Sequence, residues 1–206
     1  MVLGISEHAR RRPDKPALVE GDRVVTFAEL DERTTRLAHA LEARGIGPGN
    51  RVAVMLANSI EFFEVWGAAS KLDAPVVLVN WHLKREELSY ILEDSGAALL
   101  VAHADLLEFA EPAAKAVGCA LLLVGRGDAY EGAISAAKAE PALDLVSLAS
   151  PIFYTSGTTG RPKGAMLTHL SLVHSSMHYQ VAMGLGPTDC SVATVPLSHV
   201  TGLVAL

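Results

Sequence analysis

The chain has few cysteines, few aromatic residues and no long apolar run. Only two of its 206 residues are cysteine, Cys119 and Cys190, and their separation rules out a C-x-x-C pair. A disulfide framework and a cysteine-based metal site are therefore excluded as organising features, and we expect both thiols to be buried as small apolar groups. Aromatic residues make up 5% of a chain that is 50% hydrophobic, so alanine, leucine and valine must fill the core.

Positive charge is scarce as well. The chain has 17 lysines and arginines against 23 aspartates and glutamates, which gives a formal net charge of −6. This balance excludes a broad nucleic-acid surface, so an anionic ligand would need donors gathered locally. No stretch reaches the ~18 apolar residues of a transmembrane helix, and residues 1–12 lack the apolar segment of a secretory signal. We therefore expect a cytoplasmic protein without a membrane span.

Apolar periodicity alternates between the strand and helix types along the first 124 residues. Thr26 and Glu29 form a capping-box pattern at the start of a helix that runs to about Gly45. Beyond it, buried strands alternate with amphipathic helices, which is typical of a parallel sheet with helical crossovers. The predicted strands are residues 51–56, 75–79, 97–101 and 120–124, and the predicted helices are residues 59–72, 84–95 and 106–117. We predict an α/β fold with a doubly wound, largely parallel sheet flanked by helices.

The pattern is weaker beyond residue 124. Residues 125–150 read as a linker with one short helix near Ile134, and residues 190–195 as a buried strand. A helix over residues 170–183 carries His174 and His178 at i, i+4 spacing, which can place two imidazoles on one face. Because no carboxylate or cysteine accompanies the pair, we assign no metal site there.

Residues 154–164, with the sequence YTSGTTGRPKG, concentrate glycines, hydroxyl side chains and one lysine. Glycines let backbone N–H groups approach phosphate oxygens, and hydroxyl and ammonium groups donate to them. In a Walker A loop the lysine directly follows the second glycine and opens a helix. Here Pro162 intervenes and the short apolar segment 165–168 follows, so we expect the loop to join two strands. The predicted phosphate-binding residues are Thr155, Ser156, Gly157, Thr158, Thr159, Gly160 and Lys163. A Ser/Gly/Thr-rich surface linker is the alternative interpretation.

This stretch resembles the signature loop of the adenylate-forming superfamily, which includes acyl-CoA synthetases, peptide-synthetase adenylation domains and luciferases. The resemblance implies an acid–thiol ligase of fatty acid metabolism or a related pathway. Such an enzyme activates a fatty or aryl carboxylic acid with ATP and Mg²⁺ and passes the acyl group to coenzyme A. It also implies that Lys163 is a catalytic residue.

Two further segments resemble acyl-CoA synthetases. Asn80 and Trp81 stand where a peptide-synthetase adenylation domain usually carries Asp-Pro, and residues 196–203, PLSHVTGL, resemble the motif whose histidine lies beside the acyl pocket. The resemblance makes His199 a second catalytic candidate that lines the carboxylate site, and a helix-entry histidine without a role is the alternative. At residues 72–75 the chain departs from the Ala-Gly turn that is usual in the family.

Later motifs of the family, including the adenine pocket and the small C-terminal lysine domain, do not occur in the chain. The resemblance therefore implies part of an AMP-binding domain: residues 1–124 as a first α/β half, 125–150 as a linker-like stretch and 151–206 as the phosphate-loop segment. We expect no turnover by this chain alone. Two alternatives stay open, an adenylation domain that loads a carrier protein and a truncated, non-catalytic module for nucleotide binding or oligomerisation.

Overall fold

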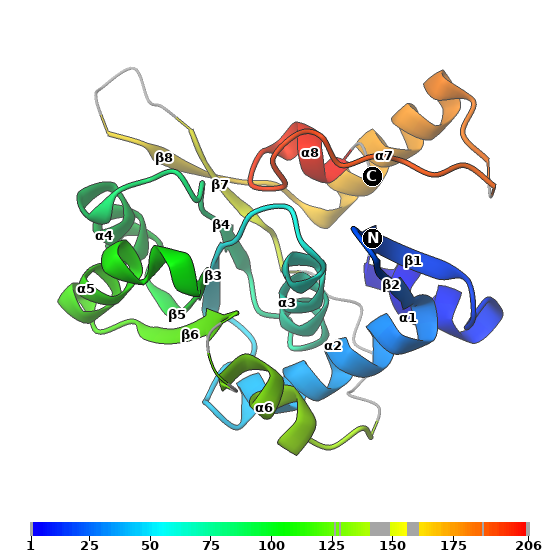
Figure 1. Ribbon diagram of the computed structural model, residues 1–206. Coiled ribbons are helices and arrows are strands. Elements are labelled where there is room, and N and C mark those ends of the chain that lie inside the picture. Colours follow the sequence, from blue (N-terminus) through cyan, green and yellow to red (C-terminus); the bar gives the residue numbers. More distant parts are fainter. Residues whose placement is uncertain are drawn as a thin grey trace.

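The structure, a computed structural model, describes residues 2–125, 127, 129–140, 149–155, 161–186 and 188–204 (Figure 1). Helices and strands alternate through most of this length. In chain order they are α1 (Val2–Arg11), β1 (Pro16–Glu20), β2 (Arg23–Thr26), α2 (Phe27–Glu42), β3 (Arg51–Met55), α3 (Ile60–Lys71), β4 (Val76–Leu78), α4 (Arg85–Ser95), β5 (Ala97–His103), the 3₁₀ turn η1 (Ala104–Leu106), α5 (Leu107–Val117), β6 (Ala120–Val124), α6 (Ala129–Ala136), β7 (Ile152–Thr155), β8 (Lys163–Met166), α7 (His169–Met183) and α8 (Val200–Val204). No helix in the described ranges is long and apolar enough to cross a membrane.

The six-stranded sheet has the order β6-β5-β3-β4-β7-β8. All neighbouring pairs are parallel except the last, in which β8 runs antiparallel to β7. The strands β1 and β2 form a separate antiparallel hairpin. The predicted α/β fold with a largely parallel sheet is confirmed.

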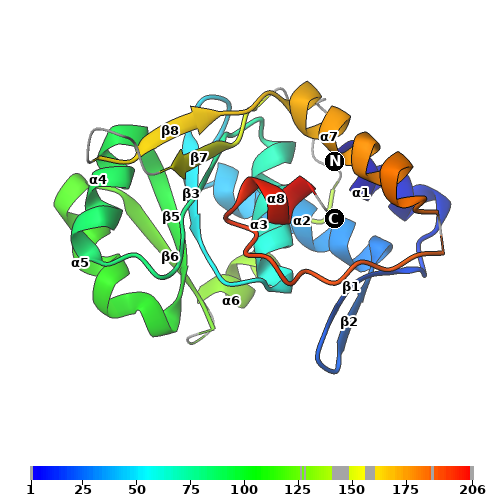
Figure 2. The ribbon, with the colours of Figure 1, turned by 90° about the horizontal axis from the view of Figure 1, so that it is seen from above.

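Helices cover both faces of this sheet. Side chains of β3 alternate between the two layers, because successive residues of a strand point to opposite faces. Val52 and Val54 belong to the cluster formed with α2 and α3, whereas Ala53 and Met55 belong to the cluster formed with α4 and α5. Figures 1 and 2 both show α4 and α5 on one side of the sheet and α2 and α3 on the other.

The two crossovers that flank the middle of the sheet leave on opposite faces. From β3 the chain passes through α3 to β4, and from β4 it passes through α4 back across β3 to β5. Ligands of open α/β sheets bind in the crevice at such a switch point, beside the carboxyl ends of the strands. Residues 56–59 and 79–83 form this edge, and the carboxyl end of β7, which pairs in parallel with β4, lies beside the second of these segments.

Helix starts follow the sequence signals. Thr26 accepts a hydrogen bond from the Glu29 backbone N–H, and the Glu29 carboxylate accepts one from the Thr26 backbone N–H, as the capping box predicts. Ser59 caps α3 by accepting from the Phe62 N–H. These side chains satisfy N–H groups that have no partner within the helix.

The part of 125–150 that forms α6 packs against the core. Its helix near Ile134 is confirmed, and Tyr130 and Ile134 are both buried. Arg33 of α2 forms an ion pair with Glu131 of this helix. Tyr130 and Ile134 therefore belong to the core, and α6 is attached to α2 through the pair of Arg33 with Glu131.

Two predictions were wrong near residue 190. Residues 190–195 form no strand and are exposed, with Val192 at 81% of its full accessibility. Cys190 is exposed too, whereas Cys119 is buried as predicted. Apolar composition favours a strand, but whether a segment becomes one depends on its tertiary context.

The turn at residues 72–75 keeps a left-handed backbone without the family's usual glycine. Asp73 has φ +52° and is the described non-glycine residue with a positive φ. Aspartate is among the residues that tolerate this conformation best. Its carboxylate also accepts a hydrogen bond from the Ala149 N–H at 2.9 Å, which ties the turn to the chain that enters β7.

Candidate active site

The predicted phosphate loop connects the two strands of a hairpin. Thr155, the last residue of β7, lies directly opposite Lys163, the first residue of β8. The prediction that the loop joins two strands is confirmed. Five of its candidate phosphate ligands, Ser156, Gly157, Thr158, Thr159 and Gly160, lie outside the described residues. The hairpin thus brings together the two candidates that the structure describes, and both are exposed.

Gly164 is required by a close approach within the hairpin. A Cβ at this position would lie 3.0 Å from Ile152 Cγ2 and 3.2 Å from Tyr154 Cζ. A side chain at this position would therefore force Ile152 or the Tyr154 ring to shift by a few tenths of an ångström. Here the glycine serves packing of the hairpin, and its φ is not positive.

Helix α4 holds both strands of the hairpin. The Tyr90 hydroxyl donates to the Pro162 carbonyl at 3.0 Å, and the Arg161 guanidinium lies 5.4 Å from the centre of the Tyr90 ring. The Tyr154 hydroxyl donates to Asp94 Oδ2 at 2.6 Å. Tyr90 and Asp94 are one turn apart and share a helix face.

The tether to Asp94 depends on a protonated phenol. Burial raises the pKa of Tyr154, and the hydrogen bond to the Asp94 carboxylate raises that pKa further. The phenol is therefore a donor at neutral pH. Sequence reasoning missed both tethers, although the i, i+4 spacing of Tyr90 and Asp94 on an amphipathic helix was a visible signal.

Removal of the Tyr90 hydroxyl should loosen the hairpin without removing the ring. We expect Tyr90→Phe to lose a hydrogen bond of about 1 kcal/mol and to speed amide exchange in β7 and β8 about fivefold. Exchange measured by mass spectrometry checks this, with Tyr179→Phe on the exposed side of α7 as the matched control. Equal exchange in the wild type and Tyr90→Phe would show that the hydroxyl does not hold the loop.

His199 lies directly before α8 and is exposed. Its backbone N–H donates to the Pro196 carbonyl at 3.0 Å, and its own carbonyl accepts from the Leu203 N–H. The neighbouring Ser198 hydroxyl is buried and has no hydrogen-bond partner among the residues that the structure describes. Asn58, which follows β3, bonds to the chain just before this histidine. His199 therefore belongs to the same carboxyl edge of the sheet as the hairpin.

Cation ligands do not gather within the described ranges. The rings of His174 and His178 lie with their centres 6.0 Å apart on α7. No group of three or more histidine, cysteine, aspartate or glutamate side chains that could hold a metal ion lies in the described part of the chain.

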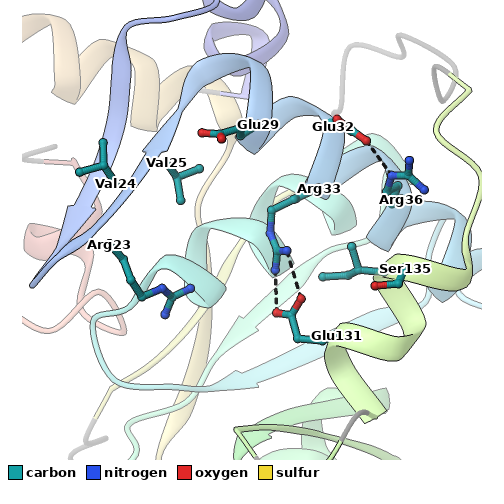
Figure 3. A pocket seen from close by; sticks show the side chains of 10 residues that line it. Arg23, Val24, Val25, Glu29, Glu32, Arg33, Arg36, Glu131 and Ser135 are labelled. Carbon is teal, nitrogen blue, oxygen red and sulfur yellow. Dashed lines mark hydrogen bonds and ion pairs between the residues drawn. The ribbon is translucent and has the colours of Figure 1, made fainter.

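A cavity of about 670 Å³ lies elsewhere, between β2, α2 and α6 (Figure 3). Its arginines are already paired: Arg33 with Glu131, Arg36 with Glu32, and Arg23 with Glu61. Such groups have little capacity left for an anion. None of the candidate site residues lines this cavity, so the carboxyl edge of the sheet is the candidate active site.

Comparison with known proteins gives a consistent result. Residues 5–206 match the family described as AMP-binding enzyme. Feruloyl-CoA synthase from an Amycolatopsis species is 38% identical over 200 residues, which cover 95% of this chain and 38% of the synthase. Tyrocidine synthase 3 of Brevibacillus parabrevis is 34% identical over 89% of this chain and 3% of its own length.

A solved structure with the same fold carries an adenylate. The anthranilate CoA ligase AuaEII in complex with anthranoyl-AMP superposes with a TM-score of 0.91 at 25% identity, over 99% of this chain and 40% of the ligase. The chain spans about two fifths of the length of the CoA ligases that it matches.

Proposed function

The chain belongs to the family of AMP-binding enzymes, and we propose that it forms part of a ligase that makes acyl-CoA thioesters from carboxylic acids. The observation that carries the proposal is the β7–β8 hairpin. It sets Thr155 opposite Lys163 at the carboxyl edge of the sheet and is held there by α4.

The first reaction needs no protein nucleophile. A substrate carboxylate is already ionised at neutral pH, and its oxygen attacks the α-phosphorus of ATP. The new bond joins that oxygen to phosphorus, and the bond from phosphorus to pyrophosphate breaks. The contribution of the protein is to position the reactants and to stabilise charge on the phosphates.

Each described site residue has a part in that positioning. The Lys163 ammonium and the Thr155 hydroxyl bind the β- and γ-phosphates, while α4 keeps the hairpin in place beneath them. Mg²⁺ would neutralise phosphate charge when it is bound with the nucleotide. His199 lines the site of the substrate carboxylate, between the acid and the thiol that later receives the acyl group.

The acid is aryl or fatty, because the similar proteins include both kinds: FadD13 of Mycobacterium tuberculosis is by its name a long-chain-fatty-acid–CoA ligase. By their names, feruloyl-CoA synthase and anthranilate CoA ligase act on aromatic acids. The thiol is coenzyme A in the first proposal. Similarity to tyrocidine synthase 3 supports a second candidate, in which the acyl group passes to a carrier protein. We place either reaction in the cytoplasm, and homo-oligomerisation stays open.

Lys163→Ala tests the proposal. A charge-assisted hydrogen bond to phosphate contributes about 1.5–3 kcal/mol, so adenylate formation in the full-length enzyme should slow about ten- to hundredfold. Thioester formation from preformed adenylate should slow less, because pyrophosphate has left by then. Rapid-quench measurement of both half-reactions checks this, with Lys138→Ala after α6 as an exposed control.

Two results would contradict the proposal. Equal losses in both half-reactions would show that Lys163 does not act at the phosphate site.

The 206-residue chain alone should bind Mg-ATP with a Kd of about 1 mM, which corresponds to a binding free energy of roughly 4 kcal/mol. It should release no pyrophosphate when an acid is added. If NMR titration with Mg-ATP leaves the β7–β8 resonances unchanged at several millimolar nucleotide, the hairpin does not bind phosphate.

A further inference from the structure

The side chain of Asn58 is fully engaged with a distant backbone segment. Its Nδ2 donates to the carbonyls of Ala193 and Val195, each at 2.9 Å, and its Oδ1 accepts from the Leu197 N–H at 2.9 Å. Asn58 stands just beyond β3, at the switch point of the sheet. Three hydrogen bonds therefore join the middle of the sheet to a segment about 135 residues further along the chain.

That segment leads directly to His199. Among the residues that the structure describes, the hydrogen bonds that join residues 189–197 to the sheet and its helices all come from Asn58. The residues before Leu197 are exposed, so burial does not fix them. The amide of Asn58 thus sets where the chain crosses the carboxyl edge before it turns into α8.

Packing beyond Leu197 leaves His199 little freedom of its own. Leu197 and Leu203 are both buried at 1% of full accessibility. A Cβ on Gly202 would lie 2.3 Å from the Pro196 carbonyl oxygen, so the turn rests directly on the backbone of α8. His199 lies between the buried side chains of Leu197 and Leu203, so a shift of residues 193–197 also moves the backbone of His199.

We propose that Asn58 is a positioning residue for His199 and, through it, for the site of the substrate carboxylate. This inference rests on the proposed function for the role of His199. Asparagine suits the task because its amide presents two donors and an acceptor at once. Aspartate has nearly the same shape but would set a carboxylate oxygen against two carbonyl oxygens, so the segment would be repelled from the edge.

Amide exchange in the 206-residue chain tests the clamp itself. We expect Asn58→Asp and Asn58→Ala to speed exchange at Leu197 by about tenfold or more, the equivalent of one lost hydrogen bond. The imidazole NMR signals of His199, assigned with His199→Gln, should shift, while exchange at Val54 inside β3 stays unchanged. Unchanged exchange at Leu197 and unchanged His199 signals would overturn the proposal.

Asn50 offers a matched control. Its Oδ1 accepts from the Gly47 N–H at 3.0 Å within a local turn, so Asn50→Asp keeps the acceptor and should leave His199 unchanged. If Asn58→Asp is too unstable to study, Asn58→Ala removes the bonds without adding charge and gives the same test. His199 shifts of equal size in Asn50→Asp would show a general effect of charge and would overturn the clamp.

The catalytic part of the inference has its own readout. In the full-length enzyme Asn58→Asp should raise the KM for the carboxylic acid about tenfold, the effect of about 1.4 kcal/mol, with the KM for ATP unchanged. If Asn58 had a purely structural role, the KM for the acid and the KM for ATP would both change or both stay the same. Either result would overturn the assignment of Asn58 as a positioning residue. If Mg-ATP leaves the wild-type hairpin unperturbed, the proposed function fails, whereas the exchange result at Leu197 is unaffected and is judged separately.

Discussion

Replacement of Arg33 by methionine is expected to lower the free energy of unfolding by about 3–5 kcal/mol, because it leaves the buried Glu64 carboxylate without its ion-pair partner. The Glu64 side chain is completely buried and receives Arg33 Nε at 2.5 Å and Nη2 at 3.1 Å. The Tyr130 hydroxyl donates to the same carboxylate at 2.8 Å. The bond to Glu64 raises the pKa of Arg33 well above its ordinary value, so the guanidinium is charged whenever the protein is folded.

Chemical denaturation of the wild type and the variant measures this loss. Arg36→Met is the matched control, because Arg36 lies on the same helix, pairs with the half-exposed Glu32 and donates to the Ala137 carbonyl at 2.8 Å. Its removal leaves no buried charge unpaired, so we expect the lost ion pair and the lost hydrogen bond to cost about 2 kcal/mol at most. The double variant Arg33→Met with Glu64→Gln should recover part of the lost stability, because it removes the unpaired buried charge and keeps an acceptor for the Tyr130 hydroxyl. Equal losses for Arg33→Met and Arg36→Met would contradict the argument.

This network shows where prediction from the sequence ends. The helices α2 and α3 could be predicted, since their caps and apolar spacing are local signals. The pairing of Arg33 with Glu64 could not, because the two are 31 residues apart and each alone is typical of a solvated helix face. Charged residues are rarely buried without a partner, and the partner is known only once the helices are packed.

The same limit divides the candidate site. The composition of residues 154–164 predicted a loop between two strands, and the hairpin confirms it. The tethers from Tyr90 and Asp94, and the clamp from Asn58, depend on contacts across the sheet and were not predicted. The strand predicted at 190–195 does not form, and Asn58 holds this segment by side-chain hydrogen bonds instead, a contact that the local pattern does not reveal.

Gly67→Leu should cost about 3 kcal/mol or more, at the upper end of the range for overpacked cores. Gly67 lies on α3 where that helix crosses α2. A Cβ there would lie 2.6 Å from Thr34 Cγ2 and 3.4 Å from Ile5 Cδ1. Thr34 is completely buried, and its hydroxyl donates to the Asp31 carbonyl at 2.9 Å, so it cannot rotate away without losing that bond.

Two comparisons separate crowding at Gly67 from the effect of replacing a helical glycine. Gly4 lies in α1, where a Cβ meets only His8 Cδ2, at 3.8 Å. Gly4→Leu should therefore stabilise the protein by up to about 1 kcal/mol, because leucine favours the helix more than glycine does. Gly67→Ala should become less harmful when Thr34→Ser removes the clashing methyl group, by about 1 kcal/mol of favourable coupling. Thermal and denaturant unfolding of the wild type, the two single variants and the double variant measure this coupling. A coupling energy near zero would show that the contact at Gly67 does not limit how closely α2 and α3 pack.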